Sequence, residues 1–150
     1  MLAIGIDPGK SGALAVIYTD EANQPFRVKV VPFEETAYRD ILATCVDSRV
    51  VCCLEKVGAM PGQGVVSMFN FGRNLGFIEG LLQANKIPYQ LIPPQTWKKE
   101  FSLSRDKQAS IDVCKRLFPD INLLPTARSR KENDGMAEAL LMAEYARRRL

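Results

Sequence analysis

The amino-acid sequence predicts an α/β domain built on a mixed five-stranded sheet with helices on its faces. Three strand-like segments open the chain, and the links between them are short enough for antiparallel hairpins. Two further apolar strands follow, and each is reached through a segment with helical spacing, as in crossover connections. At 150 residues, the chain is expected to form a single domain, 1–150, with a sizeable buried core.

The first three strands are predicted from their apolar patterns. Residues 2–7, LAIGID, are apolar up to the final aspartate and indicate a buried strand. The turn PGKSG follows, in which glycines allow unusual backbone angles, and a second strand is predicted over 12–19. A third strand is predicted over 26–32, where apolar and polar residues alternate as in a half-exposed strand.

The rest of the chain alternates between helical and strand patterns. Tyr38, Ile41 and Leu42 fall on one face of a helix over 34–46, and the almost wholly apolar stretch 49–55 predicts a central strand. The remaining expected elements are a long helix over 65–86, a strand over 89–93, a short helix within 93–101, an amphipathic helix over 104–119 with Ser104 as its N-cap, and a helix over 134–150.

Composition is that of an ordinary globular protein and narrows the functional classes. No apolar run approaches the roughly 20 residues that a membrane span needs, and the N-terminus lacks the basic region of a signal peptide. The chain has four cysteines but no histidine and no CxxC pair, so a zinc site is not expected. We therefore expect a soluble, intracellular protein with buried, reduced cysteines and no membrane partner.

Charge is distributed unevenly along the chain. The net charge is only +3, yet residues 86–131 contain ten Lys and Arg against four Asp and Glu. A basic segment in a nearly neutral protein indicates either a face for a polyanion or a solvated surface, and charge alone does not separate the two.

Four carboxylates stand out by their positions. Asp7 and Glu55 each end an apolar strand and precede a glycine-bearing loop, so they meet if their strands are neighbours. Asp134 and Glu138 are four residues apart on the last predicted helix and therefore share one of its faces. Clustered carboxylates repel one another, and Mg²⁺ with oxygen ligands is the usual way to hold them together. Two such ions about 3.5–4 Å apart suit phosphodiester hydrolysis.

Each carboxylate also has an ordinary interpretation. Asp7 is of a type that caps turns, and Glu55 is placed to meet solvent or Lys56. Asp134 stands where an N-cap of the last helix is expected, and Glu138 suits an exposed helix surface. The joint pattern of the four is more specific than any one of them.

Several motifs occur in a characteristic order. They are GIDPGKSGALAV (5–16), LEKVGAMPGQG (54–64), GFIEGLL (76–82), PPQTWKKEF (93–101) and KENDGMAEALLMAEYA (131–146). Together they span essentially the whole chain. In this order the motifs resemble those of the RuvC-type Holliday-junction resolvases of the RNase H-like superfamily. The resemblance is greatest to the branch found in phages, some bacteria and chloroplasts.

The resemblance implies an RNase H-like sheet of three antiparallel strands followed by two parallel ones. It also implies a homodimer that resolves four-way junction DNA by paired, symmetric, Mg²⁺-dependent nicks. Two ions per active site are implied, with Mn²⁺ as a substitute and no small-molecule cofactor. The implied metal ligands and catalytic carboxylates are Asp7, Glu55, Asp134 and Glu138.

The resemblance also implies basic residues around the scissile phosphate. Lys98 and Lys107 match two lysines of the family, and both are expected to hold the DNA backbone at the site, Lys107 as part of the catalytic set. The wider DNA-binding surface is expected to include Lys99, Arg105, Arg128, Arg130 and Lys131. Met60 is the large apolar candidate for insertion between bases, although internal packing or simple exposure explains it equally well.

One departure from the family concerns the closing motif. Many relatives have histidine where this chain has Asp134, and histidine there can transfer protons as well as bind metal. Aspartate binds metal but is a poor acid at neutral pH, so metal preference and pH dependence are left open.

Alternatives to a junction resolvase share part of this pattern. A nuclease of the same fold that cuts other branched DNA or RNA would use the same carboxylates. A non-catalytic junction-binding protein is a further alternative. An actin-like ATPase would need a second glycine-rich nucleotide motif, which this sequence lacks.

For the dimer, the candidate interface is the helix over 65–86, with Phe69, Phe71, Leu75 and Ile78.

Overall fold

The computed structural model describes residues 1–150 and contains a five-stranded sheet with the order β3-β2-β1-β4-β5. The strands are β1 (Leu2–Asp7), β2 (Ala13–Thr19), β3 (Pro25–Pro32), β4 (Val50–Glu55) and β5 (Gln90–Ile92). β1 pairs antiparallel with β2, and β2 pairs antiparallel with β3. β4 pairs parallel with both β1 and β5. The predicted mixed sheet is therefore confirmed.

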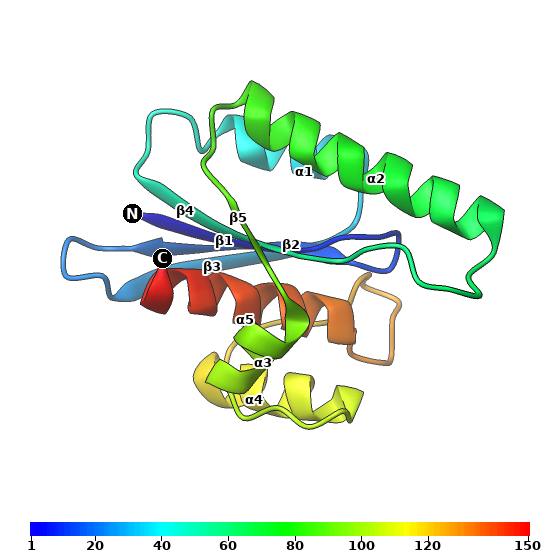
Figure 1. The fold of residues 1–150 in the computed structure, drawn as a ribbon. Coiled ribbons are helices and arrows are strands. Elements are labelled where there is room, and N and C mark those ends of the chain that lie inside the picture. Colours follow the sequence, from blue (N-terminus) through cyan, green and yellow to red (C-terminus); the bar gives the residue numbers. More distant parts are fainter.

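Five helices cover the two faces of the sheet. They are α1 (Glu35–Ala43), α2 (Val65–Ala84), α3 (Pro94–Glu100), α4 (Lys107–Leu117) and α5 (Asp134–Arg149). α1 and α2 lie on one face, and α3, α4 and α5 lie on the other (Figure 1). None of the helices is both long and apolar enough to cross a membrane.

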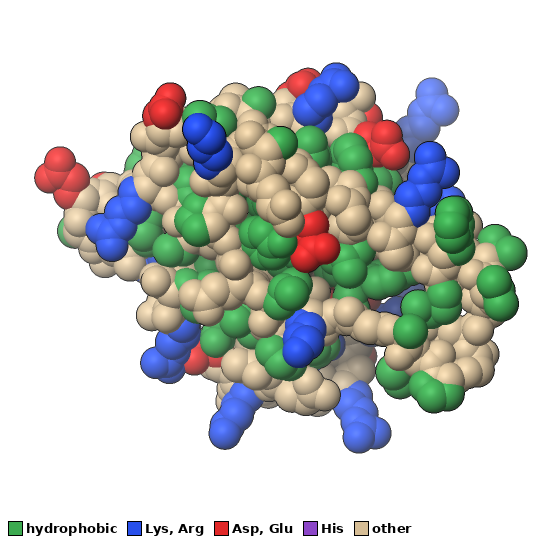
Figure 2. All heavy atoms as spheres, turned by 45° about the horizontal axis from the view of Figure 1, so that its top comes forward, with side chains coloured by type: hydrophobic (Ala, Val, Ile, Leu, Met, Phe, Trp, Pro, Cys, Tyr) green, Lys and Arg blue, Asp and Glu red, His purple; other side chains and the backbone are tan.

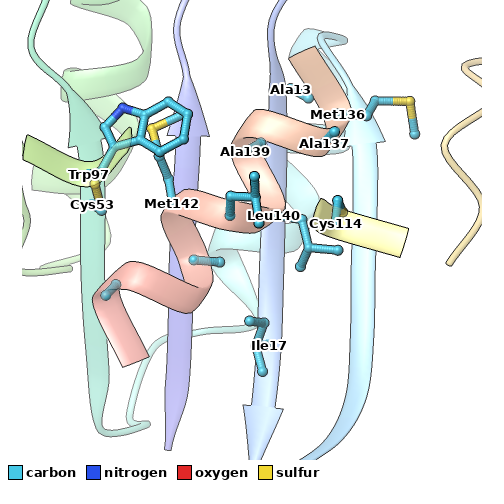
Figure 3. Packing of buried hydrophobic residues seen from close by; sticks show 14 of the residues in the cluster. Ala13, Ile17, Cys53, Trp97, Cys114, Met136, Ala137, Ala139, Leu140 and Met142 are labelled. Carbon is cyan, nitrogen blue, oxygen red and sulfur yellow. The ribbon is translucent and has the colours of Figure 1, made fainter. Parts of the chain in front are cut away.

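The sheet separates two apolar cores. Cys52 belongs to the core on the α1 and α2 side, and its neighbour Cys53 belongs to the core under α5. Figure 3 shows part of the second core, in which Cys53 and Trp97 lie near Met142 of α5. All four cysteines are buried and unbonded, as the sequence predicts.

Close packing of α5 on β1 depends on a glycine. A β-carbon at Gly5 would collide with the carbonyl oxygen of Ala139 and with the backbone nitrogen of Ala143. Only glycine therefore allows α5 to lie this close to the central strand. This contact fixes the position of the first turn of α5 relative to the end of β1.

The start of α4 differs from the expectation. Asp106, not Ser104, caps the helix, because its carboxylate accepts a hydrogen bond from the backbone N–H of Gln108 at 2.9 Å. Ser104 lies two residues earlier, and its hydroxyl oxygen accepts the backbone N–H of Asp106 at 3.3 Å. A carboxylate is a strong acceptor for the free N–H groups of a first turn, which explains why the helix begins at Lys107.

Candidate active site

Asp7 and Glu55 lie at the same end of the sheet. They end β1 and β4, which are adjacent and parallel, with Ile6 opposite Leu54 in the register. Adjacent parallel strands end at the same edge of the sheet, so the two carboxylates lie side by side there.

Asp134 and Glu138 reach this edge from α5. Asn133 caps that helix by accepting the backbone N–H of Met136 at 2.9 Å, so Asp134 is not the N-cap and its carboxylate is left for other contacts. Gly135 allows the first turn to lie against this edge, because a β-carbon there would stand 2.5 Å from the carbonyl oxygen of Ser11 and 3.4 Å from Oδ2 of Asp7.

The negative charges of the other three carboxylates act on Asp7. The pKa of Asp7 is raised from 3.8 to about 8, first by burial and then by the negative charges of Glu55, Glu138 and Asp134. Lys98 opposes this rise only in part. A positive charge among these groups would relieve the repulsion, which adds to the effect of burial on the pKa of Asp7.

Glu55 is buried rather than solvent-facing. It is only 8% exposed, and its Oε2 atom accepts a hydrogen bond of 2.8 Å from Nε1 of Trp97. Burial raises the pKa of Glu55, and the Trp97 hydrogen bond works in the opposite direction. The interpretation of Glu55 as a charge that meets solvent or Lys56 is therefore wrong, because the carboxylate is buried and its partner is Trp97.

Two lysines form ion pairs with carboxylates of the acidic cluster. Nζ of Lys98 lies 3.3 Å from Oε1 of Glu138, and Nζ of Lys107 lies 3.8 Å from Oδ2 of Asp134. The Lys107 side chain is 81% exposed, so its pair with Asp134 is weak and the ammonium group is available to an incoming anion.

The donor set fits a hard divalent cation. The ligands available are carboxylate oxygens, with no histidine or cysteine among them, which is the chemistry that Mg²⁺ prefers. The side chains as they stand do not form a closed group of three metal ligands. Instead Trp97, Lys98 and Lys107 engage Glu55, Glu138 and Asp134 respectively.

The other predicted DNA-contact residues lie outside the acidic cluster. Met60 is 65% exposed on the loop after β4, so it does not pack internally. The remaining cationic residues are also exposed: Lys99, Arg105, Arg128, Arg130 and Lys131.

A hollow of about 590 Å³ opens beside the loop after Glu55. Its apolar walls include Val57, Met60, Met68, Phe71 and Pro94. Sequence reasoning did not anticipate this hollow, because the loop folds back on α2 in a way that no local pattern encodes.

Sequence reasoning also missed Trp97 as part of the site. The only signal in the sequence is a single tryptophan next to the predicted phosphate-binding lysine. Ser110 was missed as well, and its hydroxyl donates to Oε1 of Glu138 at 3.4 Å.

Known proteins share this fold at low sequence identity. No protein-family model matches the chain, and no curated protein matches it. RuvC from Thermus thermophilus is similar with a TM-score of 0.60 and 16% identity, over 99% of this chain and 96% of that chain. RuvC from T. thermophilus in complex with a Holliday junction substrate is similar with a TM-score of 0.58 and 14% identity, over 95% of this chain and 90% of that chain.

A eukaryotic structure is also similar. The yeast mitochondrial Holliday junction resolvase Ydc2 gives a TM-score of 0.58 and 15% identity, over 97% of this chain and 77% of that chain. These similarities show that the chain has the RNase H-like fold of RuvC-type resolvases.

Proposed function

We propose that this protein is a divalent-metal-dependent endonuclease that resolves four-way DNA junctions by paired symmetric nicks. The observation that carries the proposal is the convergence of Asp7, Glu55, Asp134 and Glu138, where burial and then the negative charges of the other three raise the pKa of Asp7 to about 8. The fold shared with RuvC-type resolvases, one of them in complex with a Holliday junction substrate, supports the choice of substrate.

These four carboxylates are the residues that would hold two Mg²⁺ ions, with Mn²⁺ able to substitute. When bound, the ions supply an activated water and neutralise charge on the phosphodiester. The chain itself keeps Asp7 and Glu55 in a protected setting at the strand ends, where solvent competes weakly for their oxygens.

Lys98 and Lys107 are proposed to hold the scissile phosphate. Each ammonium group already lies within 4 Å of one acidic oxygen at the rim of the site. Because a lysine in this position offers several hydrogen-bond donors, it can hold non-bridging oxygens next to the carboxylates. The exposed cations Lys99, Arg105, Arg128, Arg130 and Lys131 would extend the contact along the backbone.

A homodimer would account for two opposed nicks, since a two-fold axis relates two identical sites. The start of α2 and the loop before it expose an apolar patch, which consists of Met60, Val65, Val66 and Phe69. Figure 2 shows hydrophobic side chains gathered at the right edge of this face, the side on which α2 begins in Figure 1. Gly72 and Gly76 face open space on the same helix, so a second helix can approach closely there.

Ile78 does not belong to that interface. It is fully buried in the core beneath α2, so the expectation that it contacts a second copy is wrong. The exposed apolar patch lies in the first half of the helix, and that half is the proposed contact.

A panel of substrates tests the proposal. Pure protein is incubated with a four-way junction, a Y-fork, linear duplex DNA and an RNA–DNA hybrid, each with Mg²⁺ or EDTA, beside Asp7→Asn. Cutting of the junction alone, abolished by EDTA and by Asp7→Asn, is expected. Cutting of forks or hybrids would assign a different substrate to the same site, and tight junction binding without cutting would indicate a non-catalytic binding protein.

A further inference from the structure

The Trp97 side chain makes one hydrogen bond, and its partner is Glu55. The indole Nε1 donates to Oε2 of Glu55 at 2.8 Å, and the Trp97 side chain is fully buried. Its ring packs in the core under α5 near Cys53 and Met142 (Figure 3). Because packing fixes the ring, its N–H points in one direction only.

This hydrogen bond constrains the Glu55 carboxylate. No other side chain donates to Glu55, so the indole N–H alone fixes which oxygen is occupied. Oε2 is satisfied by Trp97, and Oε1 is left without a protein donor. A glutamate at the end of a strand otherwise has several rotamers, and ordering it in advance lowers the entropic cost of binding a ligand.

The same helix touches a second acidic residue of the site. Lys98, the next residue of α3, pairs with Glu138 of α5 at 3.3 Å. Its ammonium group also lies 5.3 Å from the centre of the Trp97 ring. One turn of α3 therefore contacts carboxylates from both β4 and α5.

The far end of α3 is anchored away from the site. Glu100 pairs with Arg149 at 2.8 Å and with Arg148 at 3.6 Å. Arg148 also lies over the ring of Phe101 and pairs with the buried Glu144 at 2.6 Å. These contacts tie α3 to the last turns of α5, so the position of Trp97 is set by the scaffold rather than by Glu55.

We propose that Trp97 is a positioning residue that presents Glu55 to the metal ions. Its indole N–H holds Oε2 and leaves Oε1 without a protein donor, so that Glu55 would already be ordered when a cation binds. This inference rests on the proposed function, because it takes Glu55 to be a metal ligand. Removing such a hydrogen-bond partner of a ligand typically weakens metal binding by about 10- to 100-fold.

The test removes the indole N–H of Trp97 and keeps the shape of the side chain. Trp97 is the chain's only tryptophan, so growth on β-(3-benzothienyl)alanine replaces this residue alone and exchanges the N–H for sulfur. Mn²⁺ affinity is measured by calorimetry for the parent, the analogue and Glu55→Gln, after circular dichroism has verified folding. The dissociation constant for Mn²⁺ is expected to rise about 10- to 100-fold in the analogue.

Two further variants isolate the hydrogen bond. Trp97→Phe also removes the N–H and must shift the affinity in the same direction. Met142→Leu alters packing in the core around the indole but keeps the donor, so its affinity is expected to equal that of the parent. Weakened binding in Met142→Leu as large as in the analogue would show that packing, not the hydrogen bond, is responsible, and would overturn the proposal.

The outcomes separate this inference from the proposed function. If the analogue binds Mn²⁺ as tightly as the parent, Trp97 does not position Glu55, and the nuclease proposal is unaffected. If the analogue binds weakly but the parent cuts no junction, the positioning role holds and junction resolution is rejected. If Mn²⁺ binding by the parent does not depend on Glu55, both the metal site and the positioning role are rejected.

Discussion

Gly135 of α5 lies beside Asp7 of β1 at a point where the backbone leaves no room for a side chain. A β-carbon at position 135 would lie 3.4 Å from Oδ2 of Asp7 and 2.5 Å from the carbonyl oxygen of Ser11. The second distance is too short for any side chain, so glycine is required for the first turn of α5 to reach the end of β1. The positions of Asp134 and Glu138 therefore depend on this glycine.

Gly135→Ala is expected to push the start of α5 away from the turn after β1. Stability should fall by about 1–3 kcal/mol, as overpacking usually costs. Junction cleavage should fall more steeply, because Asp134 moves with the helix. Urea unfolding and single-turnover cleavage measure the two effects. Gly80→Ala is the matched control, since nothing lies within 4 Å of a β-carbon there, and its cleavage rate should equal that of the parent.

The raised pKa of Asp7 predicts an unusual pH dependence of stability without metal. The folded protein retains the Asp7 proton up to a pH of about 8, whereas the unfolded chain releases it near 3.8. Between these values the folded state binds more protons, so the free energy of unfolding falls as the pH rises. Asp7→Asn lacks this proton and should escape the loss.

Urea unfolding in EDTA from pH 5 to pH 8 measures this effect. Across that range the free energy of unfolding of Asp7→Asn should rise by about 1–3 kcal/mol relative to that of the parent. This value allows for relaxation and water around the site. Parallel profiles for the two proteins would show that the Asp7 carboxylate is not strained by its neighbours. Added Mg²⁺ should stabilise the parent at pH 8 and leave Asp7→Asn nearly unchanged.

The proposed dimer predicts a difference between two equally exposed phenylalanines. Phe69 on α2 and Phe26 on β3 are both 69% exposed. Phe69→Asp places a charge in the proposed contact and should give a monomer in light scattering, whereas Phe26→Asp should leave the dimer intact. A parent that is monomeric with and without junction DNA would contradict the dimer.

Lys98 is expected to matter for rate more than for DNA affinity. Lys98→Ala removes an ammonium group that lies 3.3 Å from Glu138, and should slow single-turnover cleavage by about 100-fold if it stabilises charge on the phosphate. Lys107→Ala should act in the same direction. Lys86→Ala, in the link between α2 and β5, is the control and should cut at the parental rate. Parental rates in both site variants would remove these lysines from the site.

Much of the fold could be predicted because its signals are local. The apolar runs ending at Asp7 and Glu55 predicted two strands that turn out to be parallel neighbours. The spacing of Asp134 and Glu138 predicted a shared helix face. The starts of helices are harder to predict, since Ser104 and Asp106 are both of a type that caps helices. Ser104 accepts the N–H of Asp106, whereas Asp106 accepts the N–H of Gln108 and caps the helix.

Contacts between distant segments could not be predicted. Trp97 and Glu55 are 42 residues apart, and their hydrogen bond depends on how α3 packs on α5. The burial of Ile78 likewise depends on which face of α2 meets the sheet, and the many apolar and glycine residues of this helix leave that face ambiguous. Such relationships follow from packing angles rather than from periodicity.

The most direct test of the account is to locate Mn²⁺ in crystals of the protein by anomalous diffraction. The account predicts two peaks about 3.5–4 Å apart at the carboxyl ends of β1 and β4, contacted by Asp7, Glu55, Asp134 and Glu138 and absent in Asp7→Asn. Peaks elsewhere on the molecule, or none at saturating Mn²⁺, would contradict the claim that these four carboxylates form a metal centre.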